Sequence, residues 1–284
     1  MLIEKEPITL NDSQKKLLKS GWGEDCIESA ITEKLTYDSD GLKVKGFFAS
    51  PKRTGKFPCV IWCRGGYGNK GALDDFTAVG ILGQLASWGY SVFASQYRGN
   101  AGGEGRDEFG GNDVNDVLNI INLADEFPEA DTENWGIEGW SRGGMMTYLA
   151  LTKTVIFKAA TVVGGIANLK CNSEESPFMK HLYTEAISGE LTNNDFCSSR
   201  SVVNFPEKLS RNTPILIIHG NSDNRVLPHD SLDLGYKLLE LGHLHKLVML
   251  ENGDHFLRAH KKEVDELRKN WLNKFLKQTG DTNA

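Results

Sequence analysis

Residues 135–150 of the chain read WGIEGWSRGGMMTYLA. A short run with aromatic and β-branched residues leads into the motif G-x-S-x-G, and an apolar run with helical character follows. The pattern predicts a strand over Trp135–Glu138, a tight turn around Ser141 and then a helix. The turn is strained, and Gly139 and Gly143 on either side of the serine leave room for it to close. We therefore expect a serine hydroxyl at the end of a strand, next to a helix N-terminus that favours a developing negative charge.

Strand-like runs and longer helical runs alternate along the rest of the chain, with glycines between them. Further strands are predicted over Leu42–Phe48, Cys59–Trp62, Val92–Gln96, Ala160–Val163, Ile215–His219 and Lys246–Leu250. Helices are predicted over Leu73–Ser87, Asp113–Glu126, Gly143–Thr152, Ser231–Leu241 and Lys261–Gln278. This order predicts an α/β fold with a mostly parallel central sheet and helices on both faces. Ligands of such sheets bind at the carboxyl ends of the strands, so reactive side chains are expected in the loops that follow strands.

One catalytic domain is predicted over residues 41–284, preceded by a polar helical lead-in over residues 1–40. The segment 168–212 is longer than a plain crossover between strands, and it mixes polar with aromatic residues. It is expected to form a small helical cap over the edge of the sheet.

Composition excludes several classes of protein. The chain carries 32 basic and 38 acidic side chains, a net charge of −6, and no basic stripe that would neutralise nucleic-acid phosphates. Hydrophobic residues at 39% and charged residues at 25% are values of a globular chain. The 5 cysteines match no metal motif. Cys59 and Cys63 lie too far apart in one predicted strand for a disulfide, which favours a reducing compartment.

The sequence favours a soluble, cytoplasmic protein without a membrane partner. The N-terminal residues lack the apolar core of a signal peptide. The uncharged run 76–97 is long enough to cross a bilayer. Its polar residues and a Trp88-Gly89-Tyr90 break indicate instead a buried helix that turns into a buried strand.

A serine hydroxyl is a weak nucleophile, so it needs a base that is itself oriented by an acid. Behind a G-x-S-x-G turn the acid and the histidine follow the serine in the chain, each on a loop after a later strand. Asp223 follows the predicted strand Ile215–His219, and His255 follows the predicted strand Lys246–Leu250. Ser141, Asp223 and His255 are therefore the predicted catalytic residues.

Two neighbouring residues have weaker claims. Asp254 is a rival for the acid, but the side chains of adjacent residues on a loop rarely point at one another. His219 ends a predicted strand and is interpreted as a packed residue that braces the Asp223 loop. The remaining histidines show no metal-ligand spacing, so neither a metal nor a cofactor is predicted.

An acyl-transfer site also needs hydrogen-bond donors for the oxyanion. The backbone N–H of Arg142, directly after the serine, is one predicted donor. The loop after the predicted strand Cys59–Trp62 is expected to supply the second, with Gly66 as the predicted residue and the Tyr67 hydroxyl as an alternative. A loop whose glycines only turn the chain is the other interpretation.

Tyr67, Arg98 and Trp140 are the candidate substrate contacts. Arg98 begins a long, glycine-rich and charged loop, from which it could reach an acidic group of a substrate. The favoured interpretation of this arginine is an internal salt bridge with an acidic residue close by in the chain: Asp107, Glu108 or Asp113.

Residues 66–71 read GYGNKG, which is literally G-x-G-x-x-G after a predicted strand and before a predicted helix. That spacing is typical of a dinucleotide site, so an NAD(P)-binding oxidoreductase is one alternative. The fingerprint also needs an acidic residue at the end of the next strand, where this chain has Gln96-Tyr97-Arg98.

Several segments together resemble the catalytic domain of the prolyl oligopeptidase family within the α/β-hydrolases. They are RGG at 64–66, YRG at 97–99 with its glycine-rich continuation, GWSRGG at 139–144, HGNSDNRV at 219–226 and GDH at 253–255. By that resemblance Ser141, Asp223 and His255 are the triad, and Gly66 and Arg142 are the oxyanion donors.

Two features depart from the large members of that family. The residues before the catalytic region are too few for an N-terminal propeller, and the family's H-G-G-P donor loop is here RGGY at 64–67. The resemblance implies a serine peptidase that hydrolyses a short peptide or an aminoacyl amide. A carboxylesterase acting on small esters is the close alternative, and a non-catalytic binding protein is another. No cofactor is implied, and the oligomeric state is left open.

Overall fold

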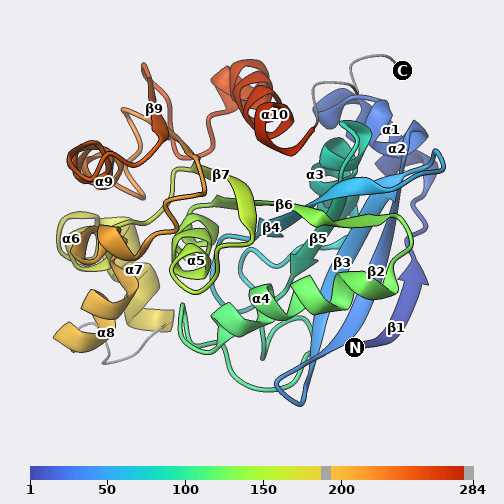
Figure 1. Ribbon diagram of the computed structural model, residues 1–284, viewed down its shortest axis with the longest axis horizontal. Helices are drawn as coiled ribbons and strands as arrows, with labels where there is room; N and C mark the ends of the chain where they lie inside the picture. The colour runs from blue at the N-terminus through green and yellow to red at the C-terminus, as the bar shows by residue number, and fades with distance from the viewer. Residues whose placement is uncertain (187–192, 278–284) are drawn as a thin grey trace. The chain divides into compact units, whose positions relative to one another are not determined.

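The structure, a computed structural model, describes residues 1–186 and 193–277 (Figure 1). The chain divides into two compact units, Met1–Gly136 and Ile137–Ala284. Strand β6 (Ala130–Trp140) runs through this division. The division therefore falls inside a strand, and the predicted start of the catalytic domain at residue 41 stays a prediction.

The first unit is built on strands in the order β1-β2-β3-β5-β4. They are β1 (Leu2–Pro7), β2 (Ala30–Ser39), β3 (Leu42–Pro51), β4 (Phe57–Cys63) and β5 (Ser91–Ser95). The pairs β1–β2, β2–β3 and β3–β5 are antiparallel, while β4 and β5 are parallel. Every residue of β5 is buried, as is typical of a strand that is covered on both faces.

The helices of the first unit are α1 (Asp12–Trp22), α2 (Asp25–Glu28), α3 (Asp75–Ser87) and α4 (Asp113–Leu123). The predicted helical lead-in over residues 1–40 is wrong in part, because this segment also contains β1 and β2. Glu33 and Lys34 in the middle of β2 are only partly buried, so the strand signal rests on a few residues such as Leu35 and Tyr37.

The strands of the second unit follow the order β6-β7-β8-β9, with β7 (Phe157–Val163), β8 (Ile215–Gly220) and β9 (His245–Leu250). The three strands β7, β8 and β9 run parallel. Val163 pairs with Ile218, and Gly220 pairs with Leu250, so these strands end at the same edge of the sheet. The loops that follow them therefore begin side by side.

The helices α5 (Arg142–Leu151), α9 (His229–Glu240) and α10 (Lys261–Leu276) complete the strand–helix alternation of the second unit (Figure 1). Each strand and helix that the sequence predicts is present, with ends shifted by a few residues. The predicted end of the last helix, at residue 278, lies outside the described residues. The α/β fold class with a mostly parallel sheet is confirmed.

The segment 168–212 is helical where it is described. It contains α6 (Leu169–Glu175), α7 (Pro177–Ala186), α8 (Asn194–Arg200) and two short 3-10 turns at Val202–Asn204 and Pro206–Lys208. Part of the predicted cap, residues 187–192, lies outside the described residues. That these helices cap the sheet edge stays a prediction.

The uncharged run 76–97 forms α3 followed by β5, as the sequence predicts. In the described part of the chain, no helix combines the length and the apolar character needed to cross a membrane. Cys59 and Cys63 both lie in β4 as reduced thiols, and Cys26 and Cys197 are also reduced.

Candidate active site

Ser141 lies at the junction of β6 and α5, where its backbone has φ 58° and ψ −123°. A non-glycine residue with positive φ is strained, and such strain is concentrated at functional sites. The Ser141 amide donates a hydrogen bond to Val163 O at 3.0 Å. Its carbonyl accepts from Gly144 N at 2.9 Å and from Ile166 N at 3.3 Å. The predicted strand, tight turn and helix around the serine are confirmed.

The turn closes tightly at Gly139. A Cβ atom at this position would lie 2.0 Å from Gly143 O and 2.5 Å from Thr147 Oγ1. The Thr147 hydroxyl already donates to Gly143 O at 3.0 Å, so this side of the turn is filled. A glycine at position 139 is therefore a condition for the backbone conformation of Ser141.

The predicted acid and base meet in the structure. His255 Nδ1 lies 2.7 Å from Asp223 Oδ2, and the other carboxylate oxygen accepts from Arg225 N at 2.8 Å and Val226 N at 3.1 Å. The Asp223 side chain is 1% exposed, and that of His255 is 11% exposed. The rival acid, Asp254, accepts instead from the Phe256 amide at 3.2 Å.

The electrostatics of this pair favour an ionised acid. Burial by itself raises the pKa of the Asp223 carboxyl. Hydrogen bonds from His219 and His255 and from the Arg225 amide outweigh burial and hold this pKa below its usual range. An ionised Asp223 accepts a hydrogen bond from Nδ1–H of His255, which leaves Nε2 of that histidine as the basic nitrogen.

The loop after β7 contacts both halves of the predicted triad. Val163 and Ile166 hold the backbone of Ser141 through hydrogen bonds. Between them, a Cβ atom on Gly164 would lie 3.5 Å from Asp223 Oδ2 and 3.6 Å from His255 Nδ1. Ser141 and the Asp223–His255 pair therefore flank one short loop. The hydrogen bond described for the His255 side chain is the one to Asp223, and a contact between histidine and serine in such sites often tightens only when substrate binds.

The predicted oxyanion loop lies in the first unit. Gly66 has φ +74°, and a Cβ atom there would lie 2.0 Å from Lys70 O, so the turn itself requires glycine. Arg64 is buried beneath the loop and donates to Gln96 O at 2.9 Å and to Gly68 O at 2.9 Å. The half-buried Tyr67 has its ring 5.9 Å from that of Phe109. The donor roles of Gly66, Tyr67 and Arg142 stay predictions.

The same loop lacks the geometry of a dinucleotide site. In that fingerprint the glycines open the helix, so that its N-terminus faces the pyrophosphate. Here α3 begins four residues after Gly71, and the carboxylate of Asp74 caps it by accepting from Thr77 N at 2.8 Å. The Gln96 side chain binds the Leu73 backbone at 2.6 and 3.1 Å, at the position where a ribose ligand would be required.

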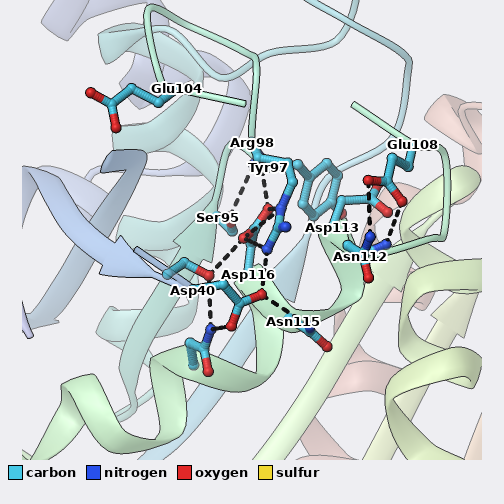
Figure 2. A network of polar contacts seen from close by, with 12 residues as sticks. Asp40, Ser95, Tyr97, Arg98, Glu104, Glu108, Asn112, Asp113, Asn115 and Asp116 are labelled. Carbon is cyan, nitrogen blue, oxygen red and sulfur yellow. Dashed lines mark hydrogen bonds and ion pairs between the residues drawn. The ribbon is translucent and has the colours of Figure 1, made fainter. Parts of the chain in front are cut away.

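Arg98 forms a buried ion pair (Figure 2). Its guanidinium donates to Asp116 Oδ1 at 2.7 Å and to Asp40 Oδ2 at 2.8 Å, and its amide donates to Asp116 Oδ2 at 2.7 Å. The hydrogen bonds with Asp116 outweigh burial and raise the pKa of the guanidinium further. Arg98 thereby ties its loop to α4 and to the β2–β3 turn, as the favoured interpretation of an internal salt bridge expects, and a substrate contact by this side chain stays a prediction.

The internal salt bridge is confirmed, but its partners differ from the predicted ones. The three acidic residues of the predicted set accept other hydrogen bonds: Asp107 from the Asn100 side chain, Glu108 from Asn112 and Asp113 from the Gly110 amide. Asp116 and Asp40 lie 18 and 58 positions from Arg98 in the chain, and only the folded unit brings them together.

One further residue near the pair was not singled out from the sequence. Arg225 lies two positions after Asp223, with its guanidinium 4.2 Å from the Phe178 ring centroid and 4.6 Å from that of Phe256. Both rings are exposed, at 40% and 44%. The only sequence signal was the position of this arginine in the acid's own loop. Trp140 is half-buried, with the Arg268 guanidinium 5.6 Å from its ring, and its substrate role stays a prediction.

The α/β-hydrolase fold is typical of one class of serine hydrolases. In these proteins a serine lies on a strained strand-to-helix turn, and an aspartate and a histidine follow it on loops after later parallel strands. The model of the prolyl oligopeptidase family matches residues 81–279. The chain belongs to this family and is a serine peptidase of the prolyl oligopeptidase type. The match includes Ser141, Asp223 and His255, whereas Gly66 and Tyr67 precede it.

The relatives of the chain differ in length. The uncharacterized peptidase YtmA of Bacillus subtilis is 33% identical over 219 residues, 73% of this chain and 79% of that protein. Dipeptidyl-peptidase 5 of Porphyromonas gingivalis is 29% identical over 62% of this chain and 27% of its own length. The acylaminoacyl peptidase of Pyrococcus horikoshii shares the fold, with a TM-score of 0.77 at 23% identity, over 98% of this chain and 46% of that one. The chain thus spans less than half of the larger relatives.

Proposed function

We propose that Ser141, Asp223 and His255 form the catalytic triad of this peptidase. Ser141 Oγ attacks the substrate carbonyl, and His255 Nε2 takes its proton and returns it to the leaving group. The 2.7 Å contact between Asp223 Oδ2 and His255 Nδ1 carries the proposal, because it orients the imidazole so that Nε2 is the base. Water then releases the acyl group from the serine.

The oxyanion of the tetrahedral intermediate needs donors beside the serine. Arg142 directly follows Ser141 and is the first residue of α5, so its amide lies at the N-terminal end of that helix. Its N–H is the first proposed donor, and the helix dipole adds to its effect. Gly66 supplies the second in this proposal, with the Tyr67 hydroxyl as the alternative.

The proposed substrate is a short peptide or an aminoacyl amide. Family membership and the peptidases among the relatives support an amide bond. Arg225, held between two exposed rings beside the Asp223–His255 pair, is suited to contact a carbonyl or carboxylate oxygen of such a chain. A small carboxylic ester is the second candidate, since the same machinery cleaves esters. The reduced thiols of the described cysteines support a cytoplasmic location.

Covalent labelling tests the nucleophile. Wild-type enzyme is expected to react with a fluorophosphonate probe, and Ser141→Ala is expected to lose all labelling. Asp223→Asn is expected to lower kcat by roughly 10⁴-fold, because the imidazole then takes the wrong tautomer. Labelling that survives in Ser141→Ala would refute the assignment. Amide and ester substrates with the same acyl group then separate the two substrate classes, as an amide leaving group depends more on protonation by His255.

A further inference from the structure

His219 makes more contacts than bracing a loop requires. It lies in β8 and is fully buried. Its Nε2 lies 3.0 Å from the carbonyl oxygen of Val226 and 3.3 Å from Oδ2 of Asp223. Its Nδ1 lies 2.6 Å from Ser231 Oγ, on the first turn of α9. Both ring nitrogens are therefore engaged, and one of them faces the proposed catalytic acid.

The chemistry of the neighbours determines the tautomer of this ring. A carbonyl oxygen and a carboxylate oxygen can only accept, so the nitrogen between them, Nε2, must carry the proton. In the ring that carries one proton, Nδ1 then accepts from the hydroxyl of Ser231, which is itself buried. His219 accordingly donates from Nε2, and this donor is shared between Val226 O and Asp223 Oδ2.

The carboxylate of Asp223 is fully engaged as a result. Its Oδ1 accepts from the amides of Arg225 and Val226, and its Oδ2 faces His255 Nδ1 and His219 Nε2. The titratable and charged groups at this carboxylate are His219 from β8, His255 from the loop after β9 and Arg225 in its own loop. A donor from His219 therefore acts on the same oxygen that holds the catalytic imidazole.

We propose that His219 is a positioning residue of the reaction: its Nε2–H fixes Asp223 Oδ2 opposite His255, and Ser231 keeps the His219 ring in the donating tautomer. This inference rests on the proposed function, in which Asp223 is the acid of the triad. By sharing Oδ2, His219 also draws electron density from the oxygen that binds His255. The shared hydrogen bond thus makes Asp223 a weaker acceptor for His255 than in a site with His255 alone.

The tautomer can be measured on the unaltered enzyme. In enzyme labelled with 15N-histidine, NMR is expected to show His219 as a neutral ring with its proton on Nε2, coupled across hydrogen bonds to the Asp223 loop. The signal is assigned by its loss in His219→Gln. A proton on Nδ1 alone would overturn the inference, whatever the activities of the variants are.

A matched pair of substitutions separates positioning from packing. The amide nitrogen of glutamine can occupy the place of Nε2, whereas the amide of asparagine reaches only the place of Nδ1. His219→Gln is expected to stay within a few-fold of wild-type kcat, and His219→Asn to lose about ten-fold or more, since a hydrogen bond to a charged group is removed. Equal losses in both variants, at equal thermal stability, would contradict a positioning role.

The pH profile gives a readout that packing alone does not change. The acid limb of kcat/KM reports protonation of His255 in the free enzyme. Without the His219 donor, Asp223 Oδ2 binds the imidazolium of His255 more strongly, so the limb moves to higher pH in His219→Asn and stays in place in His219→Gln. An unmoved limb in His219→Asn would overturn the inference. Full fluorophosphonate labelling of Ser141→Ala would instead show that the proposed function fails, independently of the NMR result.

Discussion

At the scale of single residues, the strained serine depends on a neighbour that has no side chain. Ser141 has φ 58°, a conformation that costs energy in any residue other than glycine. The strain is maintained because Gly139 lets the Gly143 carbonyl approach to a distance that no Cβ atom tolerates. The position of the proposed nucleophile therefore depends on the absence of one methyl group at residue 139.

Gly139→Ala is expected to open this turn. Relief of the overlap with Gly143 O costs about 1–3 kcal/mol of folding free energy, and a serine displaced by about 1 Å loses on the order of 100-fold in kcat. Urea denaturation and steady-state kinetics measure the two effects. The matched control is Gly21→Ala in α1, where a Cβ atom meets nothing within 4 Å and activity is expected to stay at the wild-type level. Wild-type kcat in Gly139→Ala would contradict the account.

At the scale of elements, a buried network of charges connects the glycine-rich loop after β5 to its neighbours. Arg98 connects it to Asp116 in α4 and to Asp40 at the β2–β3 turn, and Asn119 and Asn115 also donate to Asp40 (Figure 2). Because Asp116 is fully buried, removal of its cation leaves a charge without compensation. The network therefore determines where this loop leaves the sheet.

Arg98→Met is expected to lower the free energy of unfolding by about 3–5 kcal/mol, because the buried Asp116 loses its partner. At a temperature where the variant remains folded, its KM for a neutral substrate is expected to equal that of the wild type. Chemical denaturation and steady-state kinetics measure both quantities. Glu28→Gln, which removes the exposed partner of Lys19, is the control and should leave the stability unchanged. A raised KM with unaltered stability would instead support a substrate contact by Arg98 and refute its structural role.

At the scale of the whole molecule, the proposed catalytic acid links folding to pH. The pKa of Asp223 is lower in the folded chain than in the unfolded one, so its ionised form stabilises the folded state. That contribution is fully present above the unfolded-state pKa of about 3.9, and it is lost as the pH falls toward the folded-state pKa.

The stability difference between the wild type and Asp223→Asn is therefore expected to shrink as the pH is lowered from about 6 to about 3. The asparagine variant cannot ionise at this position, so it serves as the reference at each pH. Urea denaturation at a series of pH values measures the difference. A difference that grows toward acid pH would mean that the hydrogen bonds of Asp223 do not favour its charged form.

Local patterns along the chain were enough for the fold class, for most of its strands and helices, and for the serine, aspartate and histidine of the candidate site. The reason is that each signal is short-ranged: the G-x-S-x-G turn with its flanks, and an acid and a histidine each directly after an apolar run. Strand β2 could not be predicted in this way, because several of its polar residues are only partly buried and give no clear strand pattern. Its pairing with β1 and β3 in the structure identifies it as a strand.

Only the tertiary structure decided which side chains meet. It placed Asp223, and not the adjacent Asp254, against the ring of His255. It also gave Arg98 partners that are remote in the chain. It also brought His219 to the Asp223 carboxylate and Ser231 to the His219 ring, and it placed Arg225 against two rings from separate segments. Spacing in a sequence determines the direction of a side chain within its own element. Contacts between elements depend on strand order and register, which cannot be derived from the spacing of residues in one amino-acid sequence.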